Sequence, residues 1–153
     1  MQERQKDNPG VIAPPPLIYL AGLAIGFALD RFWPLNFDRY LPAGIVLIGL
    51  GIALMAIGIR EFKRAKTDYI PTRPSVRIIT AGPFRVTRNP LYLAMTLIYA
   101  GIGAAFGILW VFILLVPVLA VMHYGVIARE ERYLERKFGD EYLAYKGRVR
   151  RWL

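Results

Sequence analysis

The sequence predicts an all-α integral membrane protein with four transmembrane helices. Of its 153 residues, 56% are hydrophobic, which exceeds the roughly 45–50% typical of soluble globular chains. The charges are also segregated, because residues 8–29, 40–59 and 89–128 contain no Lys, Arg, Asp or Glu. About 20 apolar residues cross a ~30 Å hydrocarbon layer, so the first two runs each predict one span and the third predicts two spans joined by a hairpin. This pattern argues against a soluble enzyme domain and a disordered chain, and the lack of cysteine argues against a disulfide scaffold.

The flanking residues place the spans in chain order. The first is expected over residues 16–29, behind three consecutive prolines that suit only the first turn of a helix. A cleaved signal peptide is the rival interpretation, and it is disfavoured because charged residues follow directly with no small-residue cleavage pattern. The second span is expected over residues 41–59, the third over 91–106, and the fourth over 109–127 with a kink at Pro117.

Local motifs predict how these helices pack and where the last one ends. Beyond the fourth span the helix is expected to continue to Phe138 and to stop at Gly139. Close helix approach is predicted at two small-residue motifs, Gly22-x-x-x-Gly26 and Gly103-x-x-x-Gly107.

The distribution of basic residues predicts the orientation of the chain. With four spans, the N-terminus, the loop over residues 60–88 and the tail after residue 128 share one side and carry eighteen of the twenty Lys and Arg residues. The positive-inside rule places that side, with both termini, in the cytoplasm. A basic surface attracts an anionic leaflet by about 1 kcal/mol per residue, so the net charge of +9 requires no nucleic acid partner.

Two segments on this side are unlike ordinary loops, and the first precedes the third span. Pro90 suits the first turn of that helix and Asn89 suits its N-cap. The positive end of the helix dipole then points toward Arg88, which predicts an anion site. Tyr92 lies three residues after Asn89, so the two share a helix face.

The second segment follows the fourth span. His123 is the only histidine, and Glu130 and Glu131 lie where the helix is expected to leave the lipid. His123 and Glu130 are seven residues apart, which is about 20° short of two helical turns. The sequence therefore predicts that His123 stacks about 10 Å below Glu130 on one face.

Together the two segments resemble the isoprenylcysteine carboxyl methyltransferase and phospholipid methyltransferase family of membrane enzymes. The resemblance covers roughly residues 67–153 and depends on two blocks in order around one apolar hairpin, namely Gly82-Pro83-Phe84 … Arg88-Asn89-Pro90-x-Tyr92 and Arg129-Glu130-Glu131-x-x-Leu134-x-x-x-Phe138-Gly139-x-x-Tyr142-x-x-Tyr145. Arg150 departs from the family, which often has proline there, and Asn89 departs from the isoprenylcysteine enzymes, which often have histidine.

The resemblance implies an enzyme that uses S-adenosylmethionine and releases S-adenosylhomocysteine. It implies catalytic roles for Arg88 and Glu131, and a cofactor site between the third and fourth spans, capped by a C-terminal cytoplasmic helix. The implied cofactor-binding residues are Arg88, Asn89, Pro90, Tyr92, His123, Glu130 and Glu131, and the implied substrate-binding residues are Arg85, Tyr142, Tyr145 and Arg151. The whole chain, residues 1–153, is expected to form one methyltransferase domain, with two N-terminal spans in residues 1–66 and the catalytic half in residues 67–153.

The residue types suit methyl transfer independently of the resemblance. A sulfonium methyl is already activated, so the enzyme mainly aligns the donor and the acceptor. A carboxylate acceptor then needs only an arginine to hold it, whereas an amine acceptor must lose a proton, for which Glu131 or His123 is a candidate base.

Several alternatives remain open at this stage. The acceptor enters from the bilayer and is an isoprenylcysteine carboxylate or similar lipophilic molecule, with a phosphatidylethanolamine-type amine as the alternative. Taken alone, Arg88 suits a topology signal and the two glutamates suit a solvated helix face. A small transporter or scaffold belongs to another class, weakened because no charge lies inside a predicted span, and a nicotinamide-dependent membrane reductase is a third possibility. No metal site is expected, and a homodimer is possible.

Overall fold

The computed structural model describes residues 8–70 and 73–153, and within these parts the chain forms helices and no named strand. The all-α prediction is therefore confirmed for the described residues. In chain order the elements are α1 (Pro15–Phe32), α2 (Leu41–Arg64), the 3₁₀ turn η1 (Gly82–Arg85), α3 (Pro90–Phe106), α4 (Leu109–Val121), the π-helical turn η2 (Met122–Ile127), α5 (Ala128–Phe138) and α6 (Asp140–Arg148).

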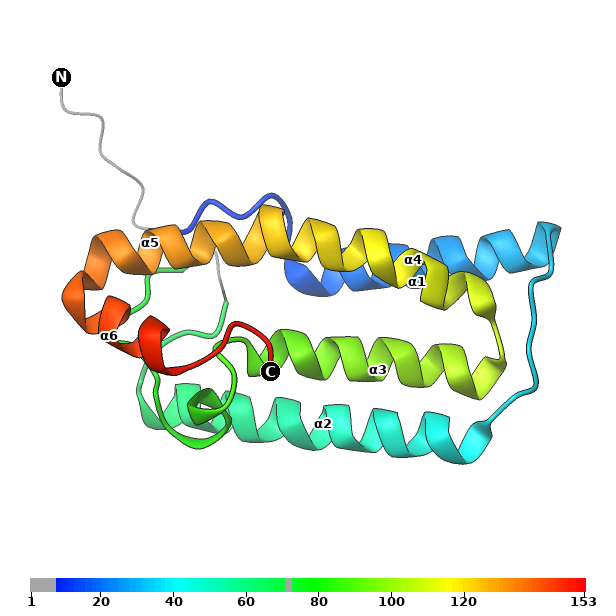
Figure 1. Ribbon diagram of the computed structural model, residues 1–153, viewed down its shortest axis with the longest axis horizontal. Helices are drawn as coiled ribbons and strands as arrows, with labels where there is room; N and C mark the ends of the chain where they lie inside the picture. Colours follow the sequence, from blue (N-terminus) through cyan, green and yellow to red (C-terminus); the bar gives the residue numbers. More distant parts are fainter. Residues whose placement is uncertain (1–7, 71–72) are drawn as a thin grey trace, which may run out of the picture.

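Four long helical rods lie side by side, and α5 continues the line of α4 (Figure 1). Within the described parts of the chain, three helical stretches are long and apolar enough to cross a membrane: α1, α2 and the continuous run from α4 to α5. The remaining rod, α3, is apolar and has 17 residues, or about 25 Å at 1.5 Å per residue.

The first two helices extend beyond the predicted spans at their C-terminal ends. α1 runs to Phe32 rather than residue 29, and α2 runs to Arg64 rather than residue 59. Charged side chains in a last helical turn remain in water, so the hydropathy of a segment marks the span and not the end of its helix. The run over residues 109–138 is about 45 Å long, about 15 Å more than the hydrocarbon layer. We therefore take α5, which is rich in charged residues, as the part outside the membrane.

The rods pack as two pairs, α2 with α3 and α1 with α4, joined by contacts of α3 with α1 and α4. α2 and α3 touch backbone to backbone, because a Cβ added to Gly44 would lie 2.8 Å from the carbonyl oxygen of Gly101. Gly22 confirms the predicted close approach, since its Cβ would lie 2.6 Å from Val118 Cγ2. Gly107 also meets a neighbouring backbone, but it ends α3 with a φ of 71°, a left-handed conformation that favours glycine.

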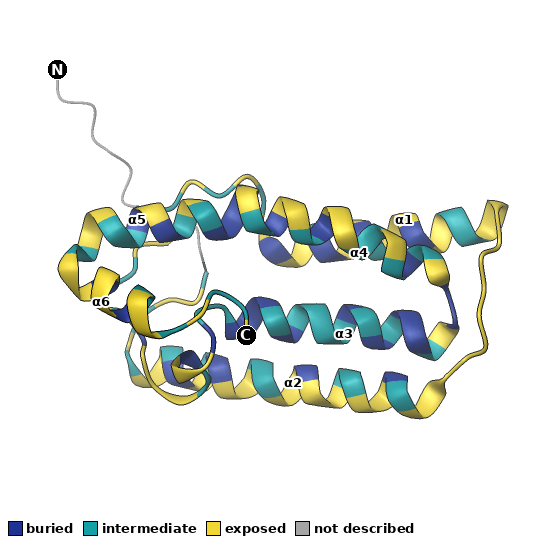
Figure 2. Cartoon of the chain, viewed as in Figure 1, coloured by how far each residue is buried: buried dark blue, intermediate teal, exposed yellow. Residues whose placement is uncertain are grey.

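The burial of residues follows the pairing of the helical rods (Figure 2). The core lies between α1, α3 and α4 and includes Tyr19, Tyr99, Val111 and Val118. The outward faces of the rods carry exposed aliphatic side chains such as Ile45, at 60% exposure. An apolar outer face around a well-packed interior is what a bilayer requires, because lipid replaces water as the solvent for that face.

The fourth rod has an irregularity that the sequence analysis placed elsewhere. Pro117, at which a kink is predicted, lies inside α4, and the helix changes type at η2, five residues farther on. A π-helical turn accommodates one extra residue in an α-helix. The predicted end at Phe138 is confirmed, and Gly139 follows it with a φ of 52°.

Candidate functional site

The first block of the site is the segment that leads into α3. Pro90 begins the helix as predicted, but the side chain of Asn89 does not cap it. Instead Asn89 Nδ2 donates to the Arg151 carbonyl oxygen at 2.9 Å, and the Thr87 hydroxyl donates to the same oxygen at 3.2 Å. Asn89 is thus the N-cap residue of α3, as predicted, but its side chain makes no capping bond, because the C-terminal segment offers a carbonyl that the asparagine amide binds.

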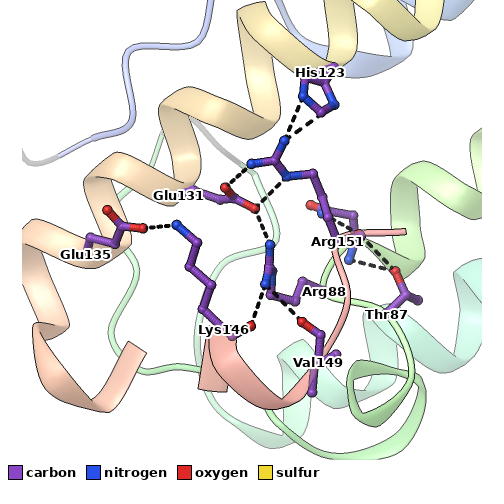
Figure 3. A network of polar contacts seen from close by, with 9 residues as sticks. Thr87, Arg88, His123, Glu131, Glu135, Lys146, Val149 and Arg151 are labelled. Carbon is purple, nitrogen blue, oxygen red and sulfur yellow. Dashed lines mark hydrogen bonds and ion pairs between the residues drawn. The ribbon is translucent and has the colours of Figure 1, made fainter. Parts of the chain in front are cut away.

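Further hydrogen bonds join the C-terminal segment to the residues that precede α3. The Arg88 amide donates to the Arg150 carbonyl at 2.9 Å. Arg88 Nη1 donates to the carbonyls of Lys146 and Val149, each at 2.9 Å. Figure 3 shows this arginine, which lies just before α3, reaching to the end of α6. The guanidinium thus fixes the last turn of α6 and the chain that follows it.

The second block is centred on Glu131 of α5, which lies between two arginines (Figure 3). Arg88 Nη2 donates to Glu131 Oε1 at 2.8 Å, Arg151 Nε donates to the same oxygen at 2.9 Å, and Arg151 Nη2 donates to Oε2 at 2.5 Å. Only 7% of the Glu131 side chain and 9% of the Arg88 side chain are exposed. Burial acts to raise the pKa of Glu131, but the hydrogen bonds from Arg151 and Arg88 outweigh it and hold that pKa below its ordinary value. The pair Arg88 and Glu131 is thus a buried ion pair within a cluster that carries one excess positive charge.

His123 joins this cluster through Arg151. Arg151 Nη1 lies 2.7 Å from His123 Nε2, and since a guanidinium can only donate, that nitrogen accepts. The prediction that His123 stacks on Glu130 is wrong. The π-helical turn inserts one residue between them, so the carboxylate that His123 shares a partner with is Glu131, one position later.

Glu130 instead faces α3. The Tyr92 hydroxyl donates to Glu130 Oε1 at 2.5 Å. Burial raises the pKa of Glu130 to about 7, the hydrogen bond from Tyr92 opposes the shift, and the charge of Glu131 adds to it. The two adjacent glutamates therefore differ: Glu131 is held as a carboxylate and Glu130 titrates near neutral pH.

Both blocks line one partly enclosed cavity at the same end of the helix bundle. Its lining includes Arg88, Asn89, Pro90, Tyr92, Glu130, Glu131, Tyr142 and Tyr145. The structure thus brings eight of the predicted site residues together. The Tyr145 hydroxyl donates to the Phe84 carbonyl at 2.7 Å, which ties α6 to the first block.

The other predicted residues lie elsewhere. Arg85 is exposed at the end of η1 and does not line this cavity. His123 lines a second, more open groove with Thr96, Leu119, Ala120, Tyr124 and Trp152. Arg151 stands between the two, since it contacts both Glu131 and His123.

One wall of the cavity was not predicted from the sequence. This wall comes from the end of α2 and the chain that follows it, and includes Phe62, Asp68, Tyr69, Ser75 and Arg77. None of these residues belongs to a spaced motif, so no pattern in the sequence singled them out.

The cavity suits a ligand with an anionic group. The Nε atom of Arg88 is buried and has no hydrogen-bond partner among the described residues. A carboxylate beside this guanidinium would supply the missing acceptor and balance the excess positive charge of the cluster. The amino-acid end of S-adenosylmethionine carries such a carboxylate, and its ammonium suits Glu130 in its charged form. The residues present therefore fit this cofactor.

An apolar helix bundle with a charged cavity at one end defines a class, the polytopic membrane proteins with a polar ligand site at the membrane surface. Comparisons with known proteins then identify the family within this class. A family model described as phospholipid methyltransferase matches residues 40–141. The chain belongs to this family, and the predicted family resemblance is confirmed.

The chain is also similar to curated proteins. The nickel-cobalt-cadmium resistance protein NccN of Alcaligenes xylosoxydans xylosoxydans is 28% identical over 104 residues, covering 67% of this chain and 47% of NccN. The cobalt-zinc-cadmium resistance protein CzcN of Cupriavidus metallidurans is 32% identical over 108 residues, covering 71% of this chain and 48% of CzcN. An uncharacterized protein of Haemophilus influenzae is 63% identical over 35 residues, covering 23% of this chain and 56% of that protein. The chain spans about half the length of the curated relatives it matches, and no solved structure matches it.

Proposed function

We propose that this protein is a membrane methyltransferase that transfers a methyl group from S-adenosylmethionine to a lipophilic acceptor at the cytoplasmic surface. The observation that carries the proposal is the meeting of the two blocks in one cavity, with Glu131 paired to both Arg88 and Arg151. Membership of the phospholipid methyltransferase family supports the reaction class.

In this proposal, different residues of the site bind different parts of the cofactor. Arg88 presents its free Nε to the carboxylate of the cofactor, and Glu131 fixes the orientation of that guanidinium through Nη2. Glu130 accepts from the cofactor ammonium, with Tyr92 holding one of its oxygens. Asn89 and Thr87 keep the C-terminal segment closed over this end of the cavity. When bound, the cofactor supplies an activated methyl group on sulfur.

The residues then align the acceptor and exclude water, which is the main requirement for an in-line displacement. Glu131 is a poor proton acceptor, because both of its oxygens are bound to arginine. The accepting nitrogen of His123 is likewise bound to Arg151, so Glu130, of which only Oε1 is bound by Tyr92, is the candidate base for an amine acceptor. The groove that contains His123 lies between α3 and α4 and has mainly apolar walls, which suits the hydrocarbon part of a lipid.

Transfer of labelled methyl groups tests the proposal. The purified protein, reconstituted in nanodiscs, is incubated with methyl-labelled S-adenosylmethionine and either a membrane lipid extract or an S-farnesylcysteine analogue. We expect label in the organic phase and its loss with Arg88→Ala. Alkali releases a methyl ester as methanol but leaves an N-methyl group, so the same samples distinguish a carboxylate acceptor from an amine. Failure to label any acceptor, with folded protein and bound S-adenosylhomocysteine, would contradict a transferase function.

A further inference from the structure

The chain before α1 lies against the fourth rod. Figure 1 shows residues 9–13, which we call the strap, running along η2 and the start of α5. The Ile12 amide donates to the Gly125 carbonyl of η2 at 3.2 Å, and Arg129 Nη1 of α5 donates to the Gly10 carbonyl at 2.9 Å. Two hydrogen bonds thus hold the strap on the segment that carries the site glutamates.

The strap also fits η2 through side-chain packing. A Cβ added to Gly125 would overlap Ile12 Cδ1 and would lie 2.8 Å from Ile12 Cγ1. A larger residue at position 125 would therefore displace Ile12. Val11 packs against the core of the helix bundle. The strap is thus seated at a defined place on the rod.

The strap forms one edge of the cavity. Pro9 lines the cavity, and every other described residue that lines it lies between residues 62 and 145. Arg129, which holds Gly10, is followed in α5 by Glu130, and Glu130 lines the same cavity. The completeness of the cavity wall therefore depends on whether the strap stays attached to α5.

The attachment of the strap is weak compared with the packing of the rods. Gly10 and Arg129 are both exposed, and Ile12 is 54% exposed. Segments with few buried apolar contacts and exposed hydrogen bonds open at a small fraction of the free energy of global unfolding. The other end of the strap is fixed, because Pro14 leads directly into Pro15 at the start of α1. The strap can therefore detach from α5 while the helices stay packed.

We propose that the strap is a lid, which closes one side of the cavity while a ligand is bound and detaches from η2 and α5 when the ligand exchanges. The inference rests on the proposed function, in which the ligand is S-adenosylmethionine or its product S-adenosylhomocysteine. Opening of a lid limits the release of product in many enzymes. Because closure and binding are linked, a bound ligand also favours the attached strap.

A covalent lock tests the lid. The chain has no cysteine, so Ile12→Cys/Gly125→Cys introduces one pair of thiols where the strap meets η2. Replacing Ile12 also removes the atoms that would overlap a side chain at position 125. Mass spectrometry verifies the disulfide, and release of labelled S-adenosylhomocysteine into excess unlabelled ligand is followed on the full chain in detergent. We expect the oxidised form to release the ligand more slowly than the same protein after reduction, by about tenfold or more, since each factor of ten requires about 1.4 kcal/mol of added barrier.

Two arginine variants test the lid without cysteines. Arg129→Ala removes one hydrogen bond to the strap and should speed ligand release by about 2- to 10-fold, which corresponds to the net free energy of one hydrogen bond. Arg132→Ala removes another exposed arginine of α5, which does not line the cavity, and should release the ligand as the wild type does. Hydrogen exchange at the Ile12 amide should slow when S-adenosylhomocysteine is added, because the bound ligand favours the attached strap.

The outcomes separate the two proposals. If the folded wild type does not bind S-adenosylhomocysteine, the proposed function and the lid both fail. If the wild type binds it and the oxidised and reduced forms of the cysteine pair release it at the same rate, the strap is not a lid and the methyltransferase proposal stands. Arg129→Ala matching Arg132→Ala, or Ile12 exchange that the ligand leaves unchanged, would overturn the lid even where the cysteine pair fails to form a disulfide.

Discussion

Replacing Glu131 by Gln keeps the side-chain volume and removes the charge that two arginines share. The amide oxygen of the glutamine can still accept a hydrogen bond from an arginine. Its amide nitrogen is a donor, however, and faces a guanidinium that also only donates. Because Arg88 is 9% exposed, its unpaired charge falls in the range of about 3–5 kcal/mol measured for breaking a buried pair. Arg151 is 29% exposed, so water screens it and its share is at most about 1 kcal/mol. We expect Glu131→Gln to lower the free energy of unfolding by about 3–5 kcal/mol.

Reversible unfolding of the protein in mixed detergent micelles, followed by circular dichroism, measures this free energy. Glu135→Gln is the matched control on the same helix, since its ion pair with Lys146 is about one-third exposed and should be worth at most about 1 kcal/mol. The double variant Glu131→Gln/Arg88→Met leaves no buried unpaired charge at Arg88, so it should be more stable than Glu131→Gln. A Glu131→Gln variant as stable as Glu135→Gln, or a strictly additive double variant, would refute the reasoning.

Two further perturbations test packing and charge. Gly22→Ala should destabilise the protein by about 1–3 kcal/mol through overpacking, because the added Cβ would lie 2.6 Å from Val118 Cγ2. The control Gly49→Ala should be neutral or slightly stabilising, because its added Cβ meets nothing within 4 Å. Equal effects of the two substitutions in the same unfolding assay would contradict the helix pairing. Since the pKa of Glu130 is raised to about 7, this carboxyl is neutral below and charged above that pH, so affinity for S-adenosylhomocysteine should rise as the pH rises through 7. Calorimetry from pH 5.5 to 7.5 should show this slope, and Glu130→Gln should abolish it; a slope that persists in the variant would show that another group titrates.

The sequence predicts the membrane spans and the helix ends of this protein. Uncharged runs placed the spans, and Pro90 and Gly139 marked a helix start and a helix end that the structure confirms. The two polar blocks were expected to meet, and the structure has them line one cavity. For the spans and the helix ends the signal is local, because each depends on its own few residues, whereas the meeting of the two blocks was implied by the family resemblance.

The parts that the sequence did not predict depend on tertiary contacts. Nothing in the sequence shows that a π-helical turn lies between His123 and Glu130, or that His123 bonds to Arg151. The side chain of Asn89 suits an N-cap, but a carbonyl from Arg151, far along the chain, binds it instead. The position of Tyr69 in the cavity wall was not predicted for the same reason, because it depends on how the segment after α2 folds back.

Calorimetric titration of the purified full chain with S-adenosylhomocysteine tests the proposed cofactor site most directly. We expect saturable binding of one ligand per chain, lost when Arg88 is replaced by Ala while Arg85→Ala, at an exposed position outside the cavity, retains it. A folded wild-type protein that gives no binding heat at several temperatures, or equal binding by both variants, would contradict a cofactor site built on Arg88 and Glu131.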